Sequence, residues 1–136
     1  MAEIRKQSDG SVKILILEDD PTIADIMTRM LKSLTFQATW VKTGEEAIQA
    51  CKEAATKRGF FDAALLDLTI SGGMGGRDAV KEMLKIDPQL KAVACSGYSD
   101  DDLNRELKAE GFAGILPKPF KAQDLSKAIK GLLGLA

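Results

Sequence analysis

The 136-residue sequence contains no histidine, and this absence removes several kinds of chemistry. A Ser-His-Asp triad, a Cys-His nucleophile pair, a His-ligated zinc site and a phosphohistidine on this chain are all excluded. Cysteine is scarce as well. Cys51 and Cys95 lie far apart without metal-site spacing, so they are predicted to be reduced thiols of the core. Any chemistry must rest on carboxylates, lysine, hydroxyl groups and the backbone.

The chain also lacks a strong charge of one sign and a long hydrophobic run. Its net charge of -1 shows no excess of basic residues of the kind that nucleic-acid-binding proteins carry. No apolar run approaches the roughly 20 residues of a membrane span, and the start lacks a signal-peptide core. With 45% hydrophobic and 29% charged residues, we expect one globular domain in the cytoplasm. We expect no direct transcriptional action by this chain alone, because no DNA-binding segment follows Ala136 in the sequence, and we expect neither nucleic acid nor a membrane as a direct partner.

Short apolar runs alternate with amphipathic segments along most of the chain. Residues 1–11 are polar without a period and are predicted to be a flexible lead-in, followed by a domain at 12–134. Strands are predicted at 13–17, 36–41, 62–67, 91–95 and 112–116. Helices are predicted from Asp20-Pro21 onward, at 43–58, 78–86 and 99–110, and around 125–133.

This alternation predicts an α/β fold, a single doubly wound (βα)5 domain with a parallel five-stranded sheet. Right-handed crossovers place strands one and three side by side, and flavodoxin-like sheets supply the full order 2-1-3-4-5. Residues 36–41 alternate in polarity and are predicted to form an edge strand, with Trp40 in a packing role. The helix at 99–110 has a thin apolar stripe and is expected to be the least firmly packed.

Acidic residues follow two of the predicted central strands. Glu18 and Asp19 come after 13–17, and Asp67 ends 62–67. The carboxyl ends of parallel strands form the ligand-binding edge of such a sheet. Two carboxylates about 5 Å apart repel by roughly 3 kcal/mol at an effective dielectric of 20. A divalent cation resolves this repulsion, and Mg2+ prefers such oxygen ligands. The sequence therefore predicts a magnesium site.

A phosphoryl group fits this pocket. Lys118 follows the fifth predicted strand and adds a positive charge, so that Mg2+ and Lys118 together balance the three carboxylates. The Asp67 carboxylate can form an acyl phosphate, Ser96 can donate its hydroxyl to a phosphoryl oxygen, and the Thr69 carbonyl can complete the metal shell. The glycine-rich segment 68–76 matches no nucleotide-loop pattern, so we interpret it as a flexible connection rather than a phosphate cradle.

Four motifs carry a resemblance to the receiver domains of response regulators in two-component signalling: Ile-Leu-Glu-Asp-Asp-Pro, Ala-Ala-Leu-Leu-Asp-Leu, Cys-Ser-Gly-Tyr-Ser and Leu-Pro-Lys-Pro-Phe. The segment 68–76 is most similar to receivers carried by hybrid sensor histidine kinases. The resemblance implies that Asp67 accepts a phosphoryl group from a phosphohistidine of a histidine kinase or histidine phosphotransfer domain. It implies that Glu18 and Asp19 hold Mg2+, and that Ser96 and Lys118 contact the phosphoryl oxygens.

The resemblance further implies a cis bond at Lys118-Pro119 and a shift of the face formed by the fourth helix, fifth strand and last helix. Two positions depart from the family. Ser71 replaces a proline in a loop that looks one residue longer, and Ile115 replaces an aromatic residue that often reports phosphorylation.

Two other hypotheses remain open at this point, and so does homodimerisation through the last helices. The first alternative to a phosphoacceptor is a receiver-like binding module that is never phosphorylated, and the second is a phosphatase with an aspartyl nucleophile. Such a phosphatase requires a second acid two residues after the nucleophile as its acid/base catalyst, and this chain has Thr69 at that position. We therefore expect no enzyme, only Mg2+-dependent self-phosphorylation and slow autodephosphorylation at most.

Overall fold

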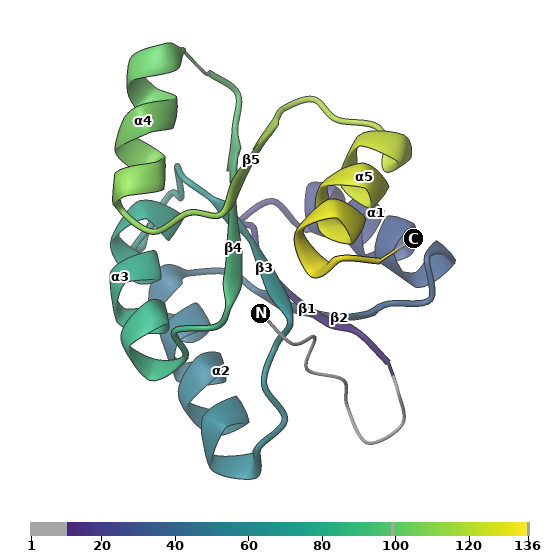
Figure 1. Ribbon diagram of the computed structural model, residues 1–136, viewed down its shortest axis with the longest axis vertical. Helices are drawn as coiled ribbons and strands as arrows, with labels where there is room; N and C mark the ends of the chain where they lie inside the picture. The colour runs from purple at the N-terminus through teal and green to yellow at the C-terminus, as the bar shows by residue number, and fades with distance from the viewer. Residues whose placement is uncertain (1–10, 99, 136) are drawn as a thin grey trace.

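A parallel five-stranded sheet lies between two layers of helices in the computed structural model, which describes residues 11–98 and 100–135 (Figure 1). The strands are β1 (Lys13–Leu17), β2 (Gln37–Val41), β3 (Ala63–Asp67), β4 (Lys91–Ser96) and β5 (Gly114–Pro117). The helices are α1 (Pro21–Ser33), α2 (Gly44–Lys57), α3 (Gly76–Ile86), α4 (Asp101–Ala109) and α5 (Ala122–Leu133). The strand order β2-β1-β3-β4-β5 confirms the predicted topology. Residues 1–10 of the predicted lead-in fall outside the described residues.

The hydrophobic core has two halves, one on each face of the sheet. In Figure 1, α1 and α5 cover one face and α2, α3 and α4 cover the other. Successive residues of a strand point to opposite faces, so Ile14 and Ile16 pack under α1 and α5, whereas Leu15 and Leu17 pack under α2 and α3. All five residues of β3 are buried because both of its faces are covered. The central strands therefore hold their carboxyl ends in fixed positions.

The start of α3 differs from the prediction and bears directly on Asp67. The helix begins at Gly76 rather than Asp78, with Gly75 at the N-cap. A Cβ atom on Gly76 would lie 2.7 Å from Leu66 Cβ and 2.8 Å from the Asp67 carbonyl oxygen. Only glycine lets the first turn of α3 approach the end of β3 so closely. Glycines that the sequence assigns to the loop thus belong partly to the helix.

Three further predictions can be compared with the structure. The strand β2 lies at an edge of the sheet and is only half-buried, as predicted. The helix α4 begins at Asp101 with Asp100 as its N-cap, and the predicted start at Ser99 lies outside the described residues. Within residues 11–98 and 100–135, no helix has both the length and the apolar character to cross a bilayer.

Both cysteines lie in the core. Cys51 and Cys95 are free and buried on different elements, as their separation in the sequence predicts. Burial raises the pKa of Cys51 to about 11 and that of Cys95 to about 12. Because the thiolate is the reactive form, neither residue is suited to nucleophilic chemistry at neutral pH.

Candidate functional site

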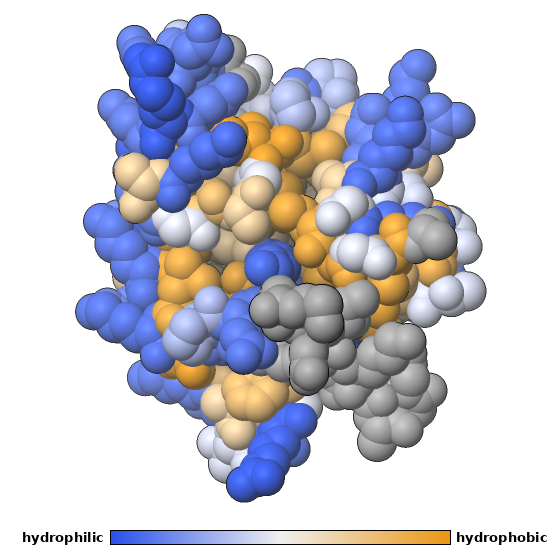
Figure 2. Space-filling view, viewed as in Figure 1, coloured by the Kyte–Doolittle hydropathy of each residue, from blue (hydrophilic) through white to orange (hydrophobic). Residues whose placement is uncertain are grey.

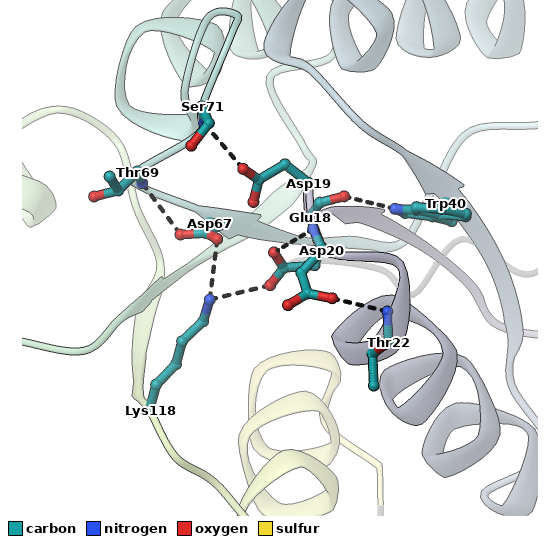
Figure 3. A network of polar contacts seen from close by, with 9 residues as sticks. All are labelled: Glu18, Asp19, Asp20, Thr22, Trp40, Asp67, Thr69, Ser71 and Lys118. Carbon is teal, nitrogen blue, oxygen red and sulfur yellow. Dashed lines mark hydrogen bonds and ion pairs between the residues drawn. The ribbon is translucent and has the colours of Figure 1, made fainter.

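Three carboxylates meet at the carboxyl edge of the sheet. Glu18 and Asp19 follow β1, and Asp67 ends the neighbouring strand β3. One carboxylate oxygen from each of these residues lies within 4.8 Å of the others. Glu18 is 2% exposed and Asp67 is 8% exposed, so both charges are largely removed from water. The parallel pairing of β1 with β3 brings this cluster together (Figure 3).

The next acid of the turn has a different role. The Asp20 side chain accepts a hydrogen bond of 2.9 Å from the backbone N–H of Thr22 and caps α1. Its own backbone N–H donates to Glu18 Oε2 at 3.1 Å. Asp20 therefore fixes the turn and orients the Glu18 carboxylate, whereas Glu18 and Asp19 supply the cluster.

Lys118 supplies a positive charge between two of the carboxylates. Its Nζ lies 3.1 Å from Glu18 Oε1 and 3.0 Å from Asp67 Oδ2 (Figure 3). The Lys118 backbone N–H donates to the Ser96 carbonyl oxygen at 2.8 Å, which continues the pairing of β5 with β4. The peptide bond to Pro119 is cis, as the resemblance implies. The side chain thus spans from the edge strand to the centre of the sheet.

The charges of the site set one another's pKa values. Burial raises the pKa of Glu18, although hydrogen bonds from the Asp20 backbone and Lys118 oppose the effect. Burial alone would lower the pKa of Lys118, but hydrogen bonds to Asp67 and Glu18 outweigh it and raise the pKa overall. A hydrogen bond from the Ser71 backbone lowers the pKa of Asp19. Lys118 is therefore a permanent cation that offsets only part of the negative charge.

The donor set fits a hard divalent cation. Three carboxylates gather within reach of one ion, and one lysine leaves negative charge unbalanced. Mg2+ is bound in proteins by one or two carboxylates together with waters and phosphate oxygens. The fourth predicted ligand, Thr69, lies at the same edge, where its N–H donates to Asp67 Oδ1 at 3.1 Å. The residues present therefore match the chemistry of a magnesium site.

The loop between β3 and α3 is fastened at two places. The Ser71 N–H donates to Asp19 Oδ2 at 3.0 Å. On the other side, the Met74 N–H donates to Glu45 Oε1 at 2.9 Å, and its carbonyl oxygen accepts from the Gly44 N–H at 2.6 Å. This differs from the flexible connection that the glycine content predicts. The loop is held by hydrogen bonds between its backbone and residues outside it. No sequence motif predicts these bonds.

The Ser96 hydroxyl is directed into its own loop. It donates to the Tyr98 carbonyl oxygen at 2.7 Å and accepts from the Tyr98 N–H at 3.2 Å. The residue lies at the end of β4, next to the strand that carries Asp67. Its predicted contact with a phosphoryl oxygen stays a prediction, and it requires the hydroxyl to leave Tyr98.

Trp40 contacts the acidic turn, whereas the sequence favours a packing role over such a contact. Its indole N–H donates to the Glu18 carbonyl oxygen at 2.7 Å, and the residue is 37% exposed. Trp40 pairs in register with Ile16 of β1, two residues before Glu18. The sequence does contain a signal for this contact. Trp40 is an aromatic residue with an N–H donor near the end of an edge strand, and the neighbouring strand is followed by acidic residues.

Comparison with known proteins identifies relatives across nearly the whole chain. A family model described as the response regulator receiver domain matches residues 14–130. The chain is 29% identical over 133 residues to the sensor kinase CckA of Brucella abortus, covering 96% of this chain and 14% of that protein. It is 30% identical over 122 residues to the chemotaxis protein CheY of Thermotoga maritima, covering 86% of this chain and 93% of CheY.

Solved structures show the same fold. The receiver domain of a sensor histidine kinase from Pseudomonas aeruginosa PAO1, with a magnesium ion coordinated in its active site cleft, superposes with a TM-score of 0.79 at 23% identity. That match covers 91% of this chain and 98% of the other. A CheY-like receiver protein from Methanospirillum hungatei JF-1 gives a TM-score of 0.80 at 24% identity and covers 91% of this chain and 94% of the other.

Proposed function

This chain belongs to the response regulator receiver domain family of two-component signalling, and from that premise we propose that it is a phosphoacceptor switch. Asp67 accepts the phosphoryl group, and residues 12–134 form the receiver unit. The observation that carries the proposal is the position of Lys118, whose ammonium group bridges Asp67 and Glu18 inside a cluster of three carboxylates. An acid at a strand end is common, but an acid paired with both a lysine and a cation site is suited to phosphoryl chemistry.

The proposed reaction is a transfer between two domains. An Asp67 carboxylate oxygen attacks the phosphorus atom of a phosphohistidine on a histidine kinase or histidine phosphotransfer domain. The phosphorus–oxygen bond forms as the phosphorus–nitrogen bond breaks, and the bond electrons return to the imidazole of the partner. The product is an acyl phosphate on Asp67. Because this chain has no histidine, the donor must come from elsewhere.

Each site residue has a role in neutralising charge. Glu18, Asp19, Asp67 and the Thr69 carbonyl would hold Mg2+, which supplies a counter-charge for the phosphoryl oxygens. Lys118 already lies 3.0 Å from Asp67 and would follow the transferred group as a second counter-charge. Ser96 would donate its hydroxyl to one phosphoryl oxygen after leaving Tyr98. We propose no turnover beyond Mg2+-dependent self-phosphorylation and slow hydrolysis of the acyl phosphate.

A hydrophobic groove next to the site offers a surface for the partner. Its volume is about 480 Å3, and it is lined by Ile23, Ile26, Met27, Met30, Gly97, Lys118, Pro119 and Phe120. Lys118 belongs both to this groove and to the acidic cluster. Ile23 and Ile26 on α1 are 36% and 48% exposed, which is unusual for large aliphatic side chains. A partner that covers them would stand directly beside Asp67.

The test is intact-mass measurement after incubation with acetyl phosphate and Mg2+. We expect the wild type to gain one phosphoryl mass, and Asp67→Asn or chelation of Mg2+ to abolish the gain. Asp20→Asn is the matched control, because Asp20 is an exposed acid of the same edge that caps α1. The proposal fails if Asp67→Asn is labelled as fully as the wild type.

A further inference from the structure

Ser71 brings a hydrogen-bond donor to a position where proline would have none. It stands in the loop between β3 and α3, at the place where the sequence departs from the expected proline. Its backbone N–H donates to Asp19 Oδ2 at 3.0 Å (Figure 3). Every residue except proline carries this donor. The bond therefore joins the loop after β3 to the turn after β1 in a way that the proline would forbid.

The three carboxylates of the cluster are held in different ways. Glu18 and Asp67 are buried, and both accept from Lys118 Nζ. Asp19 is only half-buried, so packing restricts its side chain less. The Ser71 N–H supplies a fixed direction for this side chain instead. Because a carboxylate has two oxygens, Asp19 can accept from Ser71 with Oδ2 and present Oδ1 to a cation.

The same loop is fastened to the first turn of α2. The Met74 N–H donates to Glu45 Oε1 at 2.9 Å, and the Met74 carbonyl oxygen accepts from the Gly44 N–H at 2.6 Å. The two segments lie very close together. A Cβ on Gly73 would lie 2.8 Å from Thr43 Cγ2, and a Cβ on Gly44 would lie 2.7 Å from the Met74 carbonyl oxygen. The helix α2 thus fixes the loop three residues beyond the Ser71 donor.

Glu45 has a more specific role than an ordinary exposed acid. Hydrophilic side chains cover most of the outer edge of the molecule at the left of Figure 2, over α3 and α4. Glu45 is exposed as well, yet its carboxylate accepts from a backbone N–H of the loop. The next residue, Glu46, is also exposed, and its carboxylate accepts from the Lys42 N–H instead. The two acids therefore form a matched pair, of which only Glu45 has this bond to the loop.

We propose that Ser71 is a positioning residue for the magnesium site. Its N–H, held in place through the loop by Glu45, keeps the Asp19 carboxylate in the orientation that binds Mg2+. The proposal rests on the proposed function, because it takes the acidic cluster to be the metal site. A ligand that is oriented beforehand loses less freedom when the ion binds. Hydrogen bonds that orient metal ligands contribute about 10- to 100-fold to metal affinity.

Calorimetric titration of the whole chain with Mg2+ tests the role of Ser71. Ser71→Pro removes the N–H and should weaken Mg2+ binding by about tenfold. Ser71→Ala is the matched control, because it removes the hydroxyl and keeps the N–H. Its affinity for Mg2+ should stay within about twofold of the wild-type value, since the bond to Asp19 comes from the backbone.

The rate of acetyl phosphate labelling over a series of Mg2+ concentrations separates positioning from general damage to the loop. In Ser71→Pro, the half-saturating Mg2+ concentration should rise by about tenfold. The labelling rate at saturating Mg2+ should remain at the wild-type level, because Asp67 and Lys118 are unchanged. A distorted loop would instead lower the rate at every Mg2+ concentration.

Glu45→Ala tests the support from α2 without changing the loop sequence. It removes the acceptor of the Met74 N–H and should weaken Mg2+ binding by about threefold. Combined with Ser71→Pro it should cause little further loss, because the donor to Asp19 is already gone. Glu46→Ala removes the same charge from the same turn and should leave the affinity unchanged. If Ser71→Pro does not fold, the comparison of Glu45→Ala with Glu46→Ala decides alone.

Four results would overturn the positioning role. They are wild-type Mg2+ affinity in Ser71→Pro, equal losses in Ser71→Pro and Ser71→Ala, a labelling rate at saturating Mg2+ that falls as far as the affinity, and equal affinities in Glu45→Ala and Glu46→Ala. If the wild type binds Mg2+ and is labelled in the same experiments, only the positioning role is wrong. If the wild type neither binds Mg2+ nor is labelled, the proposed function is wrong too.

Discussion

Replacing Lys118 with methionine should destabilise the protein far more than an ordinary lysine substitution. The change keeps most of the side-chain volume but removes the ammonium group from Glu18 and Asp67. At 3.1 and 3.0 Å, each pair has an attraction of about 5 kcal/mol at an effective dielectric constant of about 20. The lost hydration of Lys118 offsets part of this, because its side chain is only 23% exposed. The expected loss in unfolding free energy is about 3–5 kcal/mol at pH 7.

Urea unfolding in a chelator, followed by the fluorescence of the single tryptophan, measures this loss. The matched control is Lys85→Met, whose lysine is 72% exposed and pairs with Glu82, with an expected change within about 0.5 kcal/mol. Adding Mg2+ should restore more stability to Lys118→Met than to the wild type, because it returns a cation to the cluster. A loss below about 1 kcal/mol, or one equal to that of the control, would refute the electrostatic reasoning.

The pH dependence of the same difference provides an independent check. Burial raises the folded-state pKa of Glu18 above its ordinary value of 4.5, and removing Lys118 takes away a group that opposes the rise. A raised pKa means that the folded state binds the proton more tightly, so stability falls as pH increases from 4.5 through the folded pKa. This pH-dependent loss of unfolding free energy should be larger in Lys118→Met than in the wild type. The difference in unfolding free energy between the two proteins should therefore become smaller as the pH is lowered toward 4.5.

Three other predictions have defined outcomes, and one of them includes a control substitution. Ile26→Glu should slow phosphoryl transfer from a histidine phosphotransfer protein by about tenfold, as for about 1.4 kcal/mol of lost binding, and leave acetyl phosphate labelling unchanged; equal slowing with both donors would contradict the groove. Gly76→Ala should cost about 1–3 kcal/mol in thermal unfolding through overpacking. Gly131→Ala, where a Cβ meets no described atom within 4 Å apart from its own stretch of helix backbone, should stabilise by about 0.5–1 kcal/mol; equal changes in stability for the two glycine variants would refute the close approach at Gly76. Asp19→Asn should weaken Mg2+ binding at least about tenfold by calorimetry, while the amide oxygen still accepts from Ser71; unchanged affinity would remove Asp19 from the metal site.

The sheet could be predicted from the sequence, because each buried strand is a short apolar run and because simple rules govern how parallel strands are connected. The run before Asp67 is apolar at every position, and a strand covered on both faces needs that pattern. The same rules predicted that Glu18, Asp19 and Asp67 meet at one edge. Their proximity follows from neighbouring strands, which the observed order confirms.

What the sequence could not supply are contacts that depend on rotamers and on loop paths. The Ser96 hydroxyl was predicted to face a phosphoryl oxygen, but in this structure its rotamer directs it to the Tyr98 carbonyl oxygen. The Trp40 indole reaches a backbone oxygen, which carries no side-chain signature. Ser71 likewise acts through its N–H group, so its identity says nothing about the bond to Asp19. Local composition predicts where a loop lies, but long-range geometry decides what it holds.

The last strand has a consequence for behaviour in concentrated solution. The strand β5 is an outer member of the sheet, four residues long, and it ends at Pro117. The Lys118 N–H points inward to the Ser96 carbonyl, so the alternation of the backbone directs position 117 outward. Proline has no hydrogen to offer there. A strand from another molecule would find a short ladder with a missing donor, which discourages intermolecular sheet growth and aggregation along this side.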